Sequence, residues 1–193
     1  WLGENLAAFQ IAKQTIEGLD SDETQLQSML DRYYGYDDDY PNGLYIADAN
    51  GKLVKASESD KTENNPTDSV WYKDGLTRLN MGFTDAYTNS DGEAVISASG
   101  ILDDGSGVMK VISADLSLQR ISIIVNSFVQ MDSAQAFLVD SKDGTILADR
   151  DSSLIFTKLS DSGESFYKRI EEKRVSGDYD MEEIDNRMTA CTE

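Results

Sequence analysis

The sequence predicts an α/β protein in which a helical N-terminal segment precedes two lobes, each an antiparallel sheet with flanking helices. Three observations support this prediction. Apolar residues recur at three- and four-residue intervals over roughly the first 34 residues, which is the period of a helix. From Gly43 onward the pattern changes to strands separated by turns. The strand pattern then returns at an offset of roughly 92 to 95 residues, a spacing typical of two small lobes.

The N-terminal segment predicts two successive helices. One apolar stripe follows the first helix, through Leu2, Leu6, Phe9, Ala12, Ile16 and Leu19. Asp20 with Glu23 forms the pattern of a capping box, which would start the second helix. The acidic loop 37–43 ends helical structure, and its carboxylates lack the alternating spacing of a calcium-binding EF-hand. We therefore expect a solvated loop there.

A hairpin opens the first predicted sheet. Apolar runs at 44–48 and 52–56 flank Asn50-Gly51, a dipeptide that strongly favours a hairpin turn. The following segment, 57–68, is polar and predicts a loop. Its last residues, Thr67 or Asp68, can cap a short helix.

That short helix begins with Trp71 and Tyr72, and two strands follow it. One is expected at 93–99 and the other at 108–115, with turns rich in Asn, Asp and Gly before each. The second strand ends in Asp115 and leads into a helix expected over 116–131.

The second lobe repeats the first in weaker form. Residues 137–148 copy the hairpin, and Ser165-Phe166-Tyr167 echoes Val70-Trp71-Tyr72 at the head of a helix. No counterpart of the strand ending at Asp115 is present, so we expect the native chain to continue by at least ~20–30 residues. The predicted division is an N-terminal helical stalk at 1–34, a first lobe at 35–131 and a second lobe, incomplete at its C-terminus, at 132–193.

Composition excludes several functions. The 193 residues carry a net charge of −19, from 36 acidic and 17 basic side chains. Nucleic acid partners require clustered Lys and Arg, so none is expected, and an anionic lipid surface would repel the domain. The chain has no histidine, which excludes histidine general bases and histidine metal ligands within it. The single cysteine, Cys191, excludes an internal disulfide and a multi-cysteine zinc site. We expect neither a metal nor a cofactor.

The strongest candidate for a ligand site lies between residues 71 and 115. Aromatic faces attract a cation within ~6 Å, and a carboxylate supplies the opposite charge. Aromatic side chains and one such carboxylate come together here in a pattern that would enclose a small ligand. The candidate residues are Trp71, Tyr72, Tyr87 and Asp115, with Asp85 and Ser69 at the margin.

Each of these residues also has a purely structural interpretation. Trp71 can fill the gap between helix and sheet, and the two tyrosines can be half-buried with their hydroxyls in water. Asp115 can be the N-cap of the helix expected from Leu116, because Asp is favoured at that position.

The motifs together resemble a double Cache (dCache) domain. The resemblance is carried by the Tyr45-Ile46-Ala47-Asp48 hairpin with Gly51-Lys52, by Trp-Tyr at a helix start, by Asp85-Ala86-Tyr87, and by Ala114-Asp115-Leu116. Such domains are the extracytoplasmic sensors of methyl-accepting chemotaxis proteins and of some sensor kinases and cyclases. The resemblance implies two PAS-like lobes along one long helix, with the ligand in the first, membrane-distal lobe and the second lobe membrane-proximal. It also implies flanking transmembrane helices, which anchor the parent protein in the cell membrane and which this segment lacks.

One departure from the family pattern bears on the ligand. In the amino-acid-sensing branch, an arginine two positions before the Trp holds the ligand carboxylate, and here that position is Ser69. A tyrosine found five residues further upstream in that branch falls on Asn64. A carboxylate buried against no partner is costly, so the sequence favours a cationic or neutral polar ligand. Arg78 or Lys55 could replace the arginine from elsewhere.

Three function classes remain open. The favoured one is a non-enzymatic sensor domain of a chemoreceptor, with the sensor of a histidine kinase or diguanylate cyclase as an alternative. The second is a ligand-free structural or dimerisation module, with a homodimer formed through the N-terminal helix. The third is an extracellular enzyme with paired carboxylates such as Asp85 and Asp115, but no sequence spacing establishes the separation that glycoside hydrolysis needs.

Overall fold

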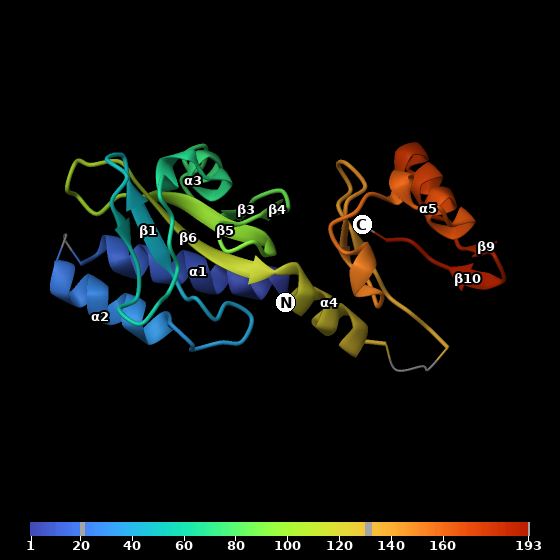
Figure 1. The fold of residues 1–193 in the computed structure, drawn as a ribbon, viewed down its shortest axis with the longest axis horizontal. Helices are drawn as coiled ribbons and strands as arrows, with labels where there is room; N and C mark the ends of the chain where they lie inside the picture. Colours follow the sequence, from blue (N-terminus) through green and yellow to red (C-terminus); the bar gives the residue numbers. More distant parts are fainter. Residues whose placement is uncertain (20–21, 130–132, 193) are drawn as a thin grey trace. The chain divides into compact units, whose positions relative to one another are not determined.

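The computed structural model describes residues 1–19, 22–129 and 133–192 (Figure 1). These residues form two compact units, Trp1–Ser117 and Leu118–Glu193, and each is described by itself. The α/β class, the N-terminal helix and the antiparallel sheets are confirmed. No helix within the described ranges is both long and apolar enough to cross a membrane.

The first unit begins with two helices, α1 (Leu2–Glu17) and α2 (Glu23–Tyr33). The predicted stripe of α1 is buried at Phe9, Ala12 and Ile16. Helix α2 begins after Asp22, whose carboxylate accepts hydrogen bonds from the backbone N–H groups of the first turn. The predicted capping residue Asp20 lies outside the described residues.

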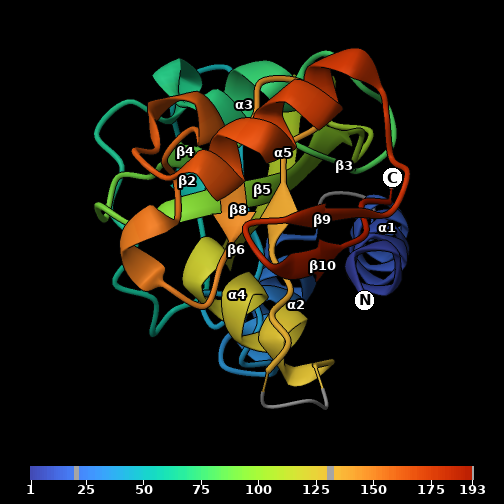
Figure 2. The ribbon, with the colours of Figure 1, turned by 90° about the vertical axis from the view of Figure 1, so that its right-hand side faces the viewer.

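The sheet of the first unit has six antiparallel strands in the order β2-β1-β6-β5-β3, with β4 also paired to β5 (Figures 1 and 2). Their bounds are β1 (Tyr45–Asp48), β2 (Leu53–Val54), β3 (Gly82–Phe83), β4 (Tyr87–Thr88), β5 (Ala94–Leu102) and β6 (Lys110–Ser117). The predicted hairpin is confirmed between β1 and β2. Its turn places Gly51 at a φ of 81°, a conformation in which glycine has no steric penalty.

Helices cover both faces of this sheet, with α1 and α2 on one side and α3 (Val70–Gly75) on the other (Figure 1). Most residues of β5 and β6 are therefore buried whichever way they point, so these strands are nearly continuous buried runs. Helix α3 follows a 3₁₀ turn, η1 (Pro66–Asp68), and its N-cap is Ser69. The prediction that Thr67 or Asp68 caps this helix was wrong, because both lie within the 3₁₀ turn.

A glycine permits the close approach of α3 to the sheet. A Cβ built at Gly75 would lie 2.4 Å from Val111 Cγ1 and 3.2 Å from Ser99 Cβ. The same helix buries Trp71 and Tyr72. The distance between α3 and β6 therefore depends on the absence of a side chain at Gly75.

The second unit begins with α4 (Leu118–Ser127) and carries two small antiparallel sheets. Its other elements are β7 (Leu138–Val139), β8 (Ile146–Ala148), η2 (Ser152–Leu154), η3 (Leu159–Asp161), α5 (Ser165–Ser176), β9 (Glu182–Ile184) and β10 (Arg187–Thr189). The predicted hairpin of the repeat is confirmed as β7–β8. Phe166 and Tyr167 of α5 lie in the core of this unit.

The junction of the two units differs from the expected helix over 116–131. Strand β6 continues through Ser117, so Asp115 lies inside a strand, and its interpretation as a helix N-cap was wrong. Helix α4 contacts β8, and the Ser122 hydroxyl donates to the Asp149 carbonyl. This helix therefore belongs to the second unit, whereas the predicted division places it in the first lobe. The boundary at 131–132 lies outside the described residues, and the division into stalk, distal lobe and proximal lobe stays a prediction.

Substitution of Gly75 by alanine should destabilise the first unit by about 1–3 kcal/mol, because the added methyl group would overlap Val111 and push α3 off the sheet. Thermal unfolding followed by circular dichroism measures the effect. The control is Gly3→Ala in α1, where no described atom lies within 4 Å of the added Cβ and the melting temperature should stay the same or rise slightly. Equal melting of Gly75→Ala and wild type would show that α3 packs less closely.

Candidate functional site

Asp115 lies at the centre of a buried polar cluster on the α3 face of the sheet. Its Oδ1 accepts hydrogen bonds from the hydroxyls of Tyr45 and Ser97, each at 2.5 Å. Its Oδ2 accepts from the Lys61 ammonium at 2.9 Å and from the Asn89 amide at 3.4 Å. All four donors are protein groups, and together they satisfy both carboxylate oxygens.

Strand register brings these groups together. Ser97 of β5 stands directly opposite Asp115 of β6, and Tyr45 of β1 stands opposite Ser113 of β6. Because side chains alternate between the faces of a sheet, Ser113 and Asp115 share one face with Val111, which contacts α3. The Tyr45 hydroxyl therefore reaches Asp115 along the sheet surface beneath the helix.

The cation of the cluster is Lys61, which is not among the residues predicted from the sequence. Its side chain is 1% exposed, that of Asp115 is 4% exposed, and its ammonium lies 4.3 Å from the centroid of the Tyr45 ring. Lys61 is the only basic residue of the polar segment 57–68. This isolated positive charge is the sequence feature that could have identified Lys61 as the partner of Asp115. A buried charge is stable only when it is paired and hydrogen-bonded, and here both ions are.

The two residues considered as substitutes for the missing arginine bind elsewhere. Arg78 donates to the Asp74 carboxylate and to the Phe83 carbonyl. The Lys55 ammonium donates at 2.6 Å to the carbonyls of Ser59 and Lys61, so it holds the backbone of the segment that carries Lys61.

Aromatic rings form the wall beside the ion pair. The Trp71 ring meets Tyr45 edge-to-face at 4.9 Å and meets Tyr72 at 5.8 Å. The Trp71 indole N–H donates to the Glu63 carboxylate at 3.0 Å. Glu63 belongs to the same irregular segment as Lys61, so this segment lies over both the aromatic wall and the carboxylate.

Tyr87 joins the cluster through a hydroxyl chain. Its hydroxyl lies 2.7 Å from the Ser97 hydroxyl, which in turn donates to Asp115. Burial, and then the neighbouring Asp115 carboxylate, raises the pKa of both Tyr45 and Tyr87 well above the ordinary tyrosine value. Both hydroxyls therefore stay protonated at neutral pH and are available as donors.

The six predicted residues thus divide into two groups. Trp71, Tyr87 and Asp115 lie in or beside the cluster. Tyr72 packs on Trp71. Burial, together with the nearby Asp48 carboxylate, raises the pKa of Tyr72, so the charge near its hydroxyl is that of Asp48 and not that of Asp115. Asp85 is exposed between β3 and β4, and the Ser69 hydroxyl donates to the Pro66 carbonyl. That any of the six binds a ligand stays a prediction.

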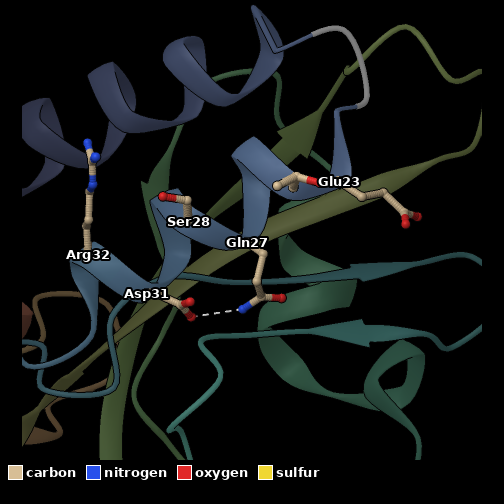
Figure 3. Close-up of a pocket in the computed structure, with 6 residues that line it drawn as sticks. Glu23, Gln27, Ser28, Asp31 and Arg32 are labelled. Carbon is tan, nitrogen blue, oxygen red and sulfur yellow. Dashed lines mark hydrogen bonds between the residues drawn. The ribbon is translucent and has the colours of Figure 1, made fainter.

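An open pocket lies on the surface of α2 (Figure 3). Its lining comes from one helix, and across it the Gln27 amide donates to the Asp31 carboxylate at 2.9 Å. None of the predicted site residues lines this pocket. Within the described ranges, no group of three or more acidic or cysteine side chains is arranged to hold a metal ion.

Removal of one member of the Lys61–Asp115 pair should cost more stability than removal of both. Lys61→Met leaves a buried carboxylate without its cation and should cost about 3–5 kcal/mol. The double variant Lys61→Met/Asp115→Asn removes both charges and should recover most of that loss. Urea unfolding of wild type, the two single variants and the double variant gives the coupling energy, and a value below about 0.5 kcal/mol would contradict a buried pair. Lys52→Met, at a side chain 65% exposed, is the control and should change stability by less than about 0.5 kcal/mol.

Alkaline pH should destabilise the first unit through Tyr45 and Tyr87. Their pKa values are raised on folding, so their stabilising contribution is complete below the unfolded value of about 10 and is lost as the pH rises above it. Each group should cost up to about 1.4 kcal/mol per pH unit in that range. Melting temperatures measured from about pH 9 to 11 should fall less steeply in Tyr45→Phe than in wild type. Equal slopes in Tyr45→Phe and wild type would refute the assignment.

The sequence of the chain is similar to part of a known chemotaxis protein. No protein-family model matches the chain. The methyl-accepting chemotaxis protein McpG of Pseudomonas putida is 32% identical over 96 residues, which cover 50% of this chain and 15% of that protein. The chain therefore corresponds to a small part of that relative's length.

Solved structures of chemoreceptor ligand-binding domains superpose on most of the chain. The domain of Pseudomonas fluorescens CtaA in complex with L-leucine has a TM-score of 0.73 and 20% identity, covering 97% of this chain and 77% of that one. The domain of Pseudomonas aeruginosa PctB in complex with L-Arg has a TM-score of 0.67 and 24% identity, covering 83% and 68%. The domain of Pseudomonas aeruginosa PctC in complex with GABA has a TM-score of 0.66 and 23% identity, covering 83% and 72%. The resemblance to the double Cache sensors of chemoreceptors is thereby confirmed, since this chain has the fold of a chemoreceptor ligand-binding domain.

Proposed function

We propose that this chain is the extracytoplasmic sensor domain of a membrane-anchored chemoreceptor, and that its first unit binds a small molecule at the Asp115 cluster. The observation that carries the proposal is a buried carboxylate with an aromatic wall, placed on the sheet of a fold that chemoreceptors use for ligand binding. Trp71, Tyr87 and Asp115 are the proposed contacts, with Tyr45 and Ser97 added from the structure.

The proposed ligand carries an ammonium group. A carboxylate beside an aromatic face is a favourable position for a cation, and the Lys61 ammonium already occupies such a position between Asp115 and the Tyr45 ring. The similar structures are complexes with L-leucine, L-Arg and GABA, and each of these ligands has an ammonium group. Amino acids and related amines are therefore the first candidates.

Binding signals only if the ligand stabilises one of two conformations more than the other. The proposed domain supplies that difference in free energy and carries out no reaction. A carboxylate pair for glycoside hydrolysis receives no support, because Asp85 is exposed whereas Asp115 is buried against Lys61. The membrane-distal position of the first unit, a homodimer through α1 and the type of output domain are further parts of the proposal.

A thermal-shift screen against amines, amino acids, organic acids and sugars tests the proposal. A ligand at about a hundred times its dissociation constant adds about 2.7 kcal/mol, which raises the melting temperature by several degrees in a domain of this size. The shift should disappear in Asp115→Asn and persist in Asp140→Asn, the matched control in the hairpin of the second unit. Shifts that persist in Asp115→Asn would place the site elsewhere. If no compound shifts wild type, the ligand-free structural module becomes the better interpretation.

A further inference from the structure

The Lys61 ammonium is held in the way that a bound amine would be held. It lies 2.9 Å from Asp115 Oδ2 and 4.3 Å from the centroid of the Tyr45 ring. A carboxylate and an aromatic face are the two partners that the proposed function assigns to the ligand ammonium. A ligand amine and Lys61 therefore compete for one position.

The backbone around Lys61 is not paired into the sheet. Residues 55–65 contain no helix or strand and connect β2 to η1. The side-chain contacts that hold this segment include those of the Lys55 ammonium with the carbonyls of Ser59 and Lys61, and that of the Glu63 carboxylate with the Trp71 indole. Withdrawal of the Lys61 side chain from Asp115 breaks no strand pairing.

We propose that ligand binding exchanges this internal ion pair for two new ones, an inference that rests on the proposed function. The ligand ammonium takes the place of the Lys61 ammonium against Asp115 and the Tyr45 ring. The displaced Lys61 ammonium then pairs with a carboxylate of the same ligand. Lys61 thus pairs with the ligand carboxylate, a role that the uncharged Ser69 cannot fill.

The exchange requires a ligand that carries both charges. An amine without a carboxylate would take Asp115 and leave the Lys61 ammonium in the buried site without an anion. An acid without an ammonium would draw Lys61 away and leave the Asp115 carboxylate buried without its cation. Either result leaves one buried charge unpaired, which is strongly destabilising. A zwitterion keeps every charge paired. The proposed exchange therefore favours zwitterions such as amino acids over the cationic or neutral polar ligand expected from the sequence.

Matched compounds test this inference on the wild-type protein. Each standard amino acid and GABA is titrated calorimetrically beside the amine that lacks its carboxylate and the acid that lacks its ammonium, for example L-leucine beside isoamylamine and isocaproate. We expect the amino acid to bind at least about 100-fold more tightly than either partial compound, because only the zwitterion leaves no buried charge unpaired. An amine or an acid that binds within a few-fold of the amino acid overturns the exchange.

Substitutions at Lys61 should change the preference rather than only the affinity. In Lys61→Gln the amine should bind as tightly as the amino acid or more tightly, because no second cation remains to be paired. Lys61→Arg should keep the preference for the zwitterion. Lys52→Gln removes the same charge from an exposed side chain of the first unit and should bind all three compounds as wild type does. An unchanged preference in Lys61→Gln contradicts the inference, and if this variant does not fold, the wild-type comparison still decides.

The results separate a failure of the exchange from a failure of the proposed function. Binding of amines alone, abolished by Asp115→Asn, would overturn the exchange and leave the sensor site standing. Binding of amines to Lys61→Gln but of nothing to wild type would make Lys61 a permanent occupant of the site, which also overturns the exchange. No binding of any compound to wild type or to Lys61→Gln would overturn both.

Discussion

A buried ammonium–carboxylate pair determines which side chains can surround it in the first unit. Each of the two charged groups, once removed from water, needs hydrogen-bonding partners in addition to the other member of the pair. Tyr45 in β1, Ser97 in β5 and Asn89, directly after β4, provide these partners for Asp115. The extended pairing of β5 with β6 has a register that places Ser97 directly opposite Asp115. A slip of one residue would turn the Ser97 hydroxyl to the other face of the sheet.

The aromatic wall depends on the same arrangement. Trp71 is 1% exposed and lies on a helix that can approach β6 only because residue 75 is a glycine. Its ring packs on Tyr45, whose hydroxyl donates to Asp115, and its indole N–H binds Glu63. The segment 55–65 is therefore attached to both the aromatic and the charged part of the cluster, and movement of this segment would change both together.

The sequence predicted the elements whose signals are local. Asn50-Gly51 identified the first hairpin, the apolar stripe identified α1, and Trp71-Tyr72 identified the helix that covers the sheet. Lys61 was missed because its segment has no periodicity, and a lysine in a polar loop is usually exposed. The N-cap interpretation of Asp115 failed because β6 runs two residues past it, and the length of a strand buried on both faces depends on tertiary packing.

The proposed exchange at the Lys61–Asp115 pair would also have a kinetic consequence. The cluster contributes no net charge, and a zwitterion adds none, so an exchange between them leaves the strongly acidic surface field unchanged. That field steers ions during diffusion but attracts or repels a molecule of zero net charge far more weakly. Encounter rates would then vary little with ionic strength, and a receptor built on such a site could report the same ligand concentration in fresh and in salty water.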